Sequence, residues 1–330
     1  MDDPVYMDNN LLDIQNLRTY FDVHGYVAKA VDNISLTIGK GKTLGLVGES
    51  GCGKSVTAHS IIKLIPQPPG RIVGGKIFFE GQNILEFSEA KMRKIRGNRI
   101  SMIFQEPMTS LNPVFSVGNQ VGEVIRLHQK LSRKDTRDRV IKMFQLVGIS
   151  EPEKRLSNYP HQLSGGMRQR VMIAMALACT PRLMIADEPT TALDVTIHAQ
   201  ILDLMNKLKD DTGAAILFIT HDMGVIAEMA QFVVVMYAGN VMEYTDVKAI
   251  FSNPKHPYTV GLLDSIPVLG RETEGGRLKT ITGIVPSLFN LPEGCLFSDR
   301  CPDVFKDCYN VKPEVYTVRE NHTTRCLKYA

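Results

Sequence analysis

The sequence predicts an α/β fold that carries a helical insert and ends in a small cysteine-rich module. Strand-like apolar runs alternate with helical segments over most of the chain, and the period turns purely helical between Val117 and Val147. Four of the six cysteines fall in the stretch from Cys295 to the C-terminus, which marks a separate module. At 330 residues the chain exceeds the usual size of one compact domain, so we expect one large domain with an appendage.

Composition narrows the range of functions. The chain is 44% apolar and 22% charged, as an ordinary globular protein is, and its net charge of +3 is too small to indicate a nucleic-acid partner. No apolar run approaches the ~18 residues of a membrane span, and the acidic N-terminus shows no secretory signal. We therefore expect a cytosolic protein that reaches a membrane only through a partner.

The first elements lead to a phosphate-binding loop. Strands are expected over 11–17, 30–38 and 43–47, and Tyr20 and Phe21, which close the first of them, could each present a ring to a purine. After the third strand the chain reads Gly48-Glu49-Ser50-Gly51-Cys52-Gly53-Lys54-Ser55, and a helix follows. Glycines let backbone amides face an anion, and the start of a helix attracts one. Lys54 can reach the β and γ phosphates, and the Ser55 hydroxyl can bind Mg²⁺.

Polar residues stand at the ends of three later buried strands. Gln105 follows the strand at 100–104, Asp187 and Glu188 end the strand from Leu183, and His221 follows the strand at 215–220. Ligands of open parallel sheets sit beyond the carboxyl ends of the strands. Asp187 is placed to hold Mg²⁺ through water, and Glu188 to orient and deprotonate an attacking water. Gln105 could touch the metal or a water, and His221 the transferred phosphate.

A second anion site is predicted at Ser164-Gly165-Gly166. Ser164 resembles an N-cap, the two glycines leave amides uncovered, and a helix is expected over 171–178. Alone, such a tripeptide would be only a helix cap. The prediction of an anion site depends on the acidic strand end that follows in the sequence.

Together these motifs resemble the nucleotide-binding subunit of an ABC transporter, over about residues 11–265. Gly48 to Ser55 matches the Walker A motif, Gln105 the Q-loop, and Leu163 to Met167 the ABC signature. Leu183 to Glu188 matches the Walker B motif, Ala192-Leu193-Asp194 the D-loop, and His221 the switch histidine. The resemblance implies the P-loop ABC cassette fold, in which a mixed sheet core with an antiparallel part carries an α-helical subdomain at about 106–180.

The family pattern implies how ATP and a partner bind. Two cassettes would close head to tail, so that Ser164, Gly165, Gly166 and Asp194 of one face the ATP held by Lys54 of the other. Phe21, or alternatively Tyr20, would stack on the adenine. At Val56 many members carry a hydroxyl residue, so here only the backbone amide remains or Thr57 compensates. Cys52 replaces the commoner serine, and its alkylation is expected to block ATP binding.

Three further stretches are similar to dipeptide and oligopeptide importer ATPases. These are 106–113 after the Q-loop, 255–259 near the end of the cassette, and 294–302 in the tail. The resemblance implies two membrane permease subunits that contact the region after Gln105, an extracytoplasmic peptide-binding protein, and a location at the cytoplasmic face of the membrane. The second cassette could be an identical copy or a paralogue.

The four cysteines of the tail are Cys295, Cys301, Cys308 and Cys326. Four thiolates suffice for an iron-sulfur cluster, and importers with this tail resemble known [4Fe-4S] binders. We expect such a cluster as a structural clip in the extension over 266–330, with zinc or uncoordinated thiols as alternatives.

Two other functions are compatible with these motifs. ABC-type ATPases also act on nucleic acid, and a nucleotide-switched sensor module is conceivable. The chain has neither the long heptad arms nor the zinc insertions of the nucleic-acid relatives. An ATPase of a peptide importer, with a cassette over 1–265, is therefore the expectation.

Overall fold

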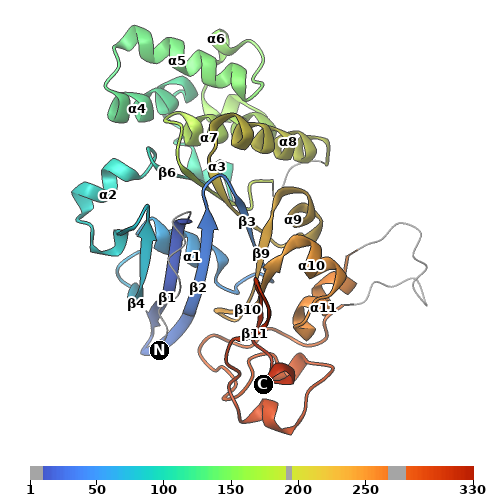
Figure 1. The fold of residues 1–330 in the computed structure, drawn as a ribbon. Coiled ribbons are helices and arrows are strands. Elements are labelled where there is room, and N and C mark those ends of the chain that lie inside the picture. The colour runs from blue at the N-terminus through green and yellow to red at the C-terminus, as the bar shows by residue number, and fades with distance from the viewer. Residues whose placement is uncertain (1–9, 191–194, 267–279) are drawn as a thin grey trace. The chain divides into compact units, whose positions relative to one another are not determined.

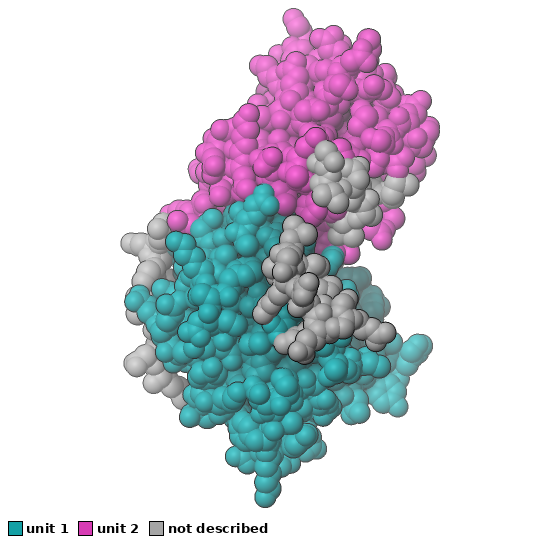
Figure 2. All heavy atoms as spheres, turned by 90° about the vertical axis from the view of Figure 1, so that its right-hand side faces the viewer, with its two compact units in different colours: residues 1–38, 43–85, 218–330 teal, residues 39–42, 86–217 magenta. Residues whose placement is uncertain are grey.

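In the computed structural model the described residues, 10–190, 195–266 and 280–330, form two compact units (Figure 2). The first unit comprises residues 1–38, 43–85 and 218–330, and the second comprises 39–42 and 86–217. Strand β8 (Ala215–Thr220), which is buried throughout, carries the chain from the second unit into the first. Among the described residues no helix is both long enough and apolar enough to span a membrane.

The first unit contains an antiparallel sheet whose strands follow the order β2-β1-β4-β5 (Figure 1). The bounds are β1 Asn10–Val23, β2 Tyr26–Gly39, β4 Gly70–Phe79 and β5 Gln82–Asn83. Strand β4 begins at Gly70, where Phe21 and Tyr20 of β1 pair with Gly70 and Arg71.

A second group of strands in this unit has the order β11-β12-β10-β9-β3. Its bounds are β3 Thr43–Val47, β9 Phe232–Tyr237, β10 Asn240–Asp246, β11 Tyr316–Arg319 and β12 His322–Thr324. Strands β3 and β9 run parallel, with Leu44 opposite Phe232 and Val47 opposite Val235. Strand β12, from the C-terminal extension, pairs antiparallel with β10. The extension therefore shares a sheet with the strand that leads to the phosphate loop.

The helices of the first unit are short. They are α1 Lys54–Ile61, α9 Met223–Met229, α10 Val247–Ser252, α11 Pro257–Asp264 and the 3₁₀ turns Ser298–Arg300, Lys306–Tyr309 and Leu327–Tyr329. An apolar core joins β3 and β9 to α9, α11 and the extension, through Val47, Ile226, Tyr237, Tyr258 and Phe297. The extension thus packs by ordinary hydrophobic burial.

The second unit places helices against a parallel strand pair. Its bounds are α2 Glu89–Ile95, β6 Ile100–Ile103, α3 Pro107–Ser110, α4 Val117–Gln129, α5 Arg133–Leu146, α6 Pro152–Arg155, α7 Gly165–Leu177, β7 Leu183–Asp187 and α8 Val195–Thr212, with 3₁₀ turns Ile84–Glu86 at the unit boundary and Pro160–Gln162. Helix α7 packs on β6 and on the helices α4 and α5. The predicted fold class, a mixed α/β cassette with an antiparallel part and a helical region, is confirmed. The boundaries at 106–180 and 265 stay predictions.

Candidate functional site

The phosphate loop begins where the buried strand β3 ends at Val47. A Cβ atom on Gly48 would lie 2.2 Å from the carbonyl oxygen of Met236, and one on Gly53 would lie 2.2 Å from that of Ala30. Gly51 and Gly53 also have φ of 80° and 104°, a region that favours glycine. Glycine is therefore required by space at two positions and by backbone angle at two.

Helix α1 starts directly after this loop. Gly53 caps it in a left-handed conformation, and no side chain caps the helix start. The Lys54 side chain is 5% exposed and its Nζ donates to the carbonyl oxygens of Gly48 at 2.7 Å and Glu49 at 3.2 Å. The Lys54 ammonium therefore lies inside the turn of the loop, where phosphate binding requires a positive charge.

Two neighbours of Lys54 bear on our expectations. Cys52 is fully buried, and burial raises the pKa of its thiol. That its alkylation blocks ATP binding stays a prediction. Thr57 is also fully buried and its Oγ1 donates to the carbonyl oxygen of Gly53 at 2.9 Å. This bond turns the Thr57 hydroxyl toward the helix backbone and favours the alternative in which the backbone amide of Val56 serves alone.

The two candidate aromatic residues on β1 have different partners. The Tyr20 hydroxyl donates to Oδ1 of Asp32 at 2.8 Å, and burial together with this bond raises the pKa of Tyr20 to about 12. The half-buried Phe21 ring packs instead on Gly70, where an added Cβ would lie 2.7 Å from Phe21 Cε1. Because Tyr20 is tethered by its hydroxyl, Phe21 is the better candidate for stacking.

His221 lies in the first unit, at the end of β8, and its side chain is exposed. The next residue, Asp222, caps helix α9 because its Oδ1 accepts from the amide of Gly224 at 2.7 Å. This cap fixes the turn that carries His221.

The second unit brings Gln105 and Glu188 together. Strands β6 and β7 run parallel with Ile103 opposite Ala186, so both strands end at the same edge. Gln105 Nε2 donates to Glu188 Oε2 at 3.2 Å. Glu188 has a φ of 46°, which is strained for a non-glycine residue, and Asp187 before it is 2% exposed. The Gln105 amide thus orients the Glu188 carboxylate at this edge.

The predicted signature segment starts helix α7 in this same unit. Ser164 is the N-cap, and its Oγ accepts from the amide of Met167 at 3.4 Å. A Cβ added to Gly165 would meet nothing within 4 Å, whereas one on Gly166 would lie 3.0 Å from Ile197. Gln169, which is 2% exposed, donates its side-chain amide to the carbonyl oxygen of Pro189.

The Gln169 bond joins the signature helix to the segment just after Glu188. Sequence reasoning missed this residue, because the helix was expected over 171–178 and is observed from Gly165. Asp194, predicted in the D-loop, lies outside the described residues.

The predicted [4Fe-4S] cluster at Cys295, Cys301, Cys308 and Cys326 is wrong. Among the residues that the structure describes, no three histidine, cysteine, aspartate or glutamate side chains are placed to hold a metal ion, which gives no support to zinc either. Burial raises the pKa of Cys301, of Cys326 and of Cys295, the last to about 11. The buried Cys295 and Cys308 pack in the apolar core around Phe297, as small apolar side chains do.

Glu49, in the phosphate loop, has partners that sequence reasoning did not connect to it. Its carboxylate pairs with the Arg300 guanidinium, and its amide donates to the Tyr258 hydroxyl at 2.9 Å. Both partners lie in stretches that suggested only the importer subfamily.

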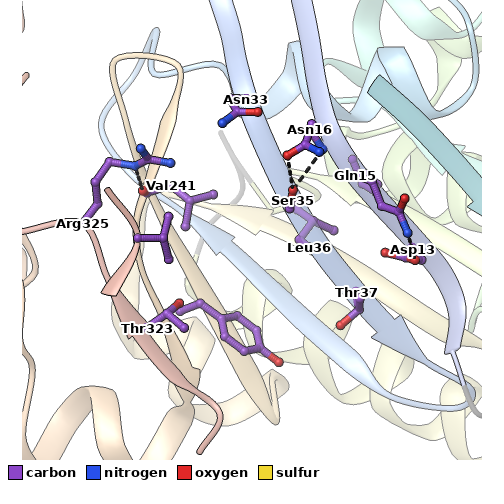
Figure 3. A pocket seen from close by; sticks show the side chains of 13 residues that line it. Asp13, Gln15, Asn16, Asn33, Ser35, Leu36, Thr37, Val241, Thr323 and Arg325 are labelled. Atoms are coloured by element: carbon purple, nitrogen blue, oxygen red, sulfur yellow. Dashed lines mark hydrogen bonds between the residues drawn. The ribbon is translucent and has the colours of Figure 1, made fainter. Parts of the chain in front are cut away.

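A separate cavity of about 560 Å³ lies in the first unit, lined by residues of β1, β2, β10 and β12 (Figure 3). Its polar side chains pair with groups of the same wall. Ser35 Oγ accepts from the amide of Asn16 at 2.9 Å, and Arg325 Nε donates to the carbonyl oxygen of Val241 at 3.1 Å. No residue predicted for nucleotide binding lines this cavity.

Comparison with known proteins identifies the family. Residues 31–191 match the model for "ABC transporter" and residues 242–308 the model for "Oligopeptide/dipeptide transporter, C-terminal region". The chain is 51% identical, over 96% of its length and 95% of the relative, to the probable peptide ABC transporter ATP-binding protein y4tR of Sinorhizobium fredii. It is 49% identical to the oligopeptide transport ATP-binding protein AppD of Bacillus subtilis, over 97% of each chain.

A solved structure agrees with these relatives. The dimeric ATP-binding cassette MJ0796 in a post-hydrolysis state, bound to ADP and Pi, is 26% identical and superposes with a TM-score of 0.65, over 72% of this chain and 98% of that one. The chain belongs to the ABC transporter ATP-binding proteins, in the group that carries the oligopeptide/dipeptide transporter C-terminal region.

Proposed function

We propose that this chain binds and hydrolyses ATP to power the import of dipeptides or oligopeptides through an ABC transporter. The observation that carries the proposal is the pairing of Gln105 with Glu188 at the edge where β6 and β7 end, in a chain that also holds a glycine-built phosphate loop. The names of the relatives, which are peptide-transport ATP-binding proteins, supply the substrate class.

The phosphate loop would hold the triphosphate. Its backbone amides from Gly48 to Val56 and the Lys54 ammonium would surround the phosphates, and Phe21, with Tyr20 as the weaker candidate, would stack on the adenine. The residues that would hold Mg²⁺ are Ser55, Gln105 and Asp187, which are the oxygen donors this ion prefers. When bound, Mg²⁺ neutralises negative charge on the phosphates.

Glu188 would act as general base. Its carboxylate would orient a water molecule and accept a proton from it, while Gln105 Nε2 holds one of the two carboxylate oxygens in place. His221 would contact the γ phosphate and complete the catalytic set.

The active assembly would be a dimer of cassettes. Ser164, Gly165, Gly166 and Asp194 of one chain would face the ATP of the other, which would be an identical copy or a paralogue. Two permease subunits would dock on the region after Gln105, and a peptide-binding protein would deliver the peptide outside. The chain would thus lie at the cytoplasmic face of the membrane without entering it.

The test is Glu188→Gln, which keeps the size of the side chain but removes the base. We expect this variant to bind ATP, to stop hydrolysing it, and to accumulate as an ATP-bound dimer in size-exclusion chromatography. Lys54→Ala is the matched control and should neither bind ATP nor dimerise. A Glu188→Gln chain that hydrolyses ATP at the wild-type rate would overturn the proposed role of Glu188.

A further inference from the structure

The Glu49 carboxylate would repel the triphosphate that the phosphate loop is proposed to bind. Glu49 is the second residue of this loop, and its side chain is 30% exposed. Two negative groups 5 to 10 Å apart repel each other appreciably at the effective dielectric of a protein surface. A carboxylate at this position therefore needs a counter-charge.

Arg300 supplies this counter-charge from the C-terminal extension. Its Nη1 lies 2.7 Å from Glu49 Oε2 and its Nη2 lies 3.0 Å from Oε1, so the pair is bidentate. The Arg300 side chain is only 4% exposed, and the hydrogen bonds with Glu49 raise the pKa of its guanidinium. Unlike an exposed ion pair, which contributes little, this pair is shielded from water on the arginine side.

The rest of the guanidinium is fixed by neutral oxygen atoms. Its Nε donates to the carbonyl oxygen of Thr282 at 3.0 Å, and Nη1 lies 3.3 Å from the Tyr237 hydroxyl. Since its other contacts are neutral, the charge of Arg300 is directed to the Glu49 carboxylate.

An aromatic cluster positions both partners of Glu49. The Tyr258 ring lies 4.7 Å from that of Tyr237 and 5.4 Å from that of Phe297, between ring centroids. Phe297 directly precedes the turn Ser298–Arg300, and Tyr258 accepts the Glu49 amide proton. The same buried rings therefore fix the arginine that pairs with the Glu49 side chain and the hydroxyl that binds its backbone.

We propose that Arg300 is a positioning residue for ATP, which neutralises Glu49 and so makes the phosphate loop able to accept the triphosphate. The C-terminal extension is then a part of the nucleotide site. This inference rests on the proposed ATPase function and adds to it a residue that touches the loop and not the reacting atoms.

The experiment measures the Kd for ATP on the full chain in the Glu188→Gln background, where turnover is slow. Arg300→Met should raise the Kd at least tenfold, because it leaves the Glu49 carboxylate unpaired beside the phosphates. Adding Glu49→Gln to Arg300→Met should restore most of the affinity, since it removes the charge that Arg300 had balanced. A purely structural role for Arg300 predicts no such rescue.

Lys328→Met is the matched control. Lys328 pairs with Asp303 at 2.7 Å within the same extension, away from the loop, and its loss should leave the Kd within twofold. Thermal unfolding checks that each variant is folded. If Arg300→Met does not fold, Arg300→Lys replaces it, and its Kd should still rise several-fold because lysine cannot pair in a bidentate manner.

Three outcomes distinguish a failure of the proposed role of Arg300 from a failure of the proposed ATPase function. Wild-type affinity in a folded Arg300→Met chain, or a double variant as weak as Arg300→Met, would overturn the role of Arg300. A parent chain that binds no ATP at all would overturn the proposed function instead.

Discussion

Glu49 and Glu188 are two carboxylates that follow two fully buried parallel strands, yet their partners differ. Glu49, after β3, pairs with a buried guanidinium, and Glu188, after β7, accepts from the neutral amide of Gln105. A guanidinium neutralises the charge of the carboxylate that it pairs with, whereas an amide orients a carboxylate without neutralising it. This difference fits the separate roles proposed for Glu49 and Glu188.

The backbone around the two residues follows the same division. The loop that carries Glu49 is built on glycines with positive φ, which adopt it without strain. Glu188 is itself at φ 46°, a conformation that is strained for a residue other than glycine. The two carboxylates thus differ in backbone conformation as well as in their partners.

The largest expected effect is on hydrolysis in Glu188→Gln. Loss of a general base typically costs 10² to 10⁴ in rate, so kcat should fall by about that factor, while the Kd for ATP changes little. Phosphate release under saturating ATP measures it. Glu49→Gln should lower kcat far less, because that carboxylate is proposed to take no proton. Equal losses of kcat in both variants would break the comparison.

The second prediction concerns how the stability of the region around Glu49 depends on pH. His256 is 1% exposed, and its ring centroid lies 5.8 Å from that of Phe297. Its Nδ1 accepts from the Tyr258 amide at 3.0 Å, and burial lowers its pKa to about 3. Below pH 6.5 the unfolded chain gains a proton that the folded chain excludes, so stability is full above that pH and declines below it. Between pH 7 and pH 5 the free energy of unfolding should drop by about 2 kcal/mol from this residue.

Urea unfolding at the two pH values checks this loss. His256→Asn keeps an acceptor for the Tyr258 amide at the start of helix α11 but cannot titrate, so its stability should change less between them. If the free energy of unfolding of His256→Asn drops between pH 7 and pH 5 as much as that of the wild type, another group is responsible for the loss.

Features that depend on neighbouring residues could be predicted from the sequence. The phosphate loop is eight consecutive residues with a glycine pattern that is visible in the sequence, and Gln105 and Glu188 meet because each follows a strand of the same parallel pair. Both inferences need only the strand assignments. The fold class follows from the same alternation of strands and helices.

Features that depend on tertiary packing could not be predicted. Arg300 and Glu49 are 251 residues apart, and no local pattern pairs them. Four cysteines and a family resemblance predicted a cluster, but the sequence does not show how these side chains are placed, and among the described residues no three such ligands converge on a metal ion. Likewise Tyr20 and Phe21 are equivalent as aromatic neighbours until the bond from Tyr20 to Asp32 separates them.

The smallest expected effect sharpens the comparison at Gln105. Gln105→Ala removes one solvent-exposed hydrogen bond to the Glu188 carboxylate, so kcat should fall about tenfold. Gln105→Glu is more informative, because a second carboxylate beside Glu188 repels it and cannot donate a hydrogen bond to it. Phosphate release under saturating ATP should therefore show a larger loss of kcat in Gln105→Glu than in Gln105→Ala. Wild-type kcat in both variants would mean that the bond from Gln105 does not orient the base.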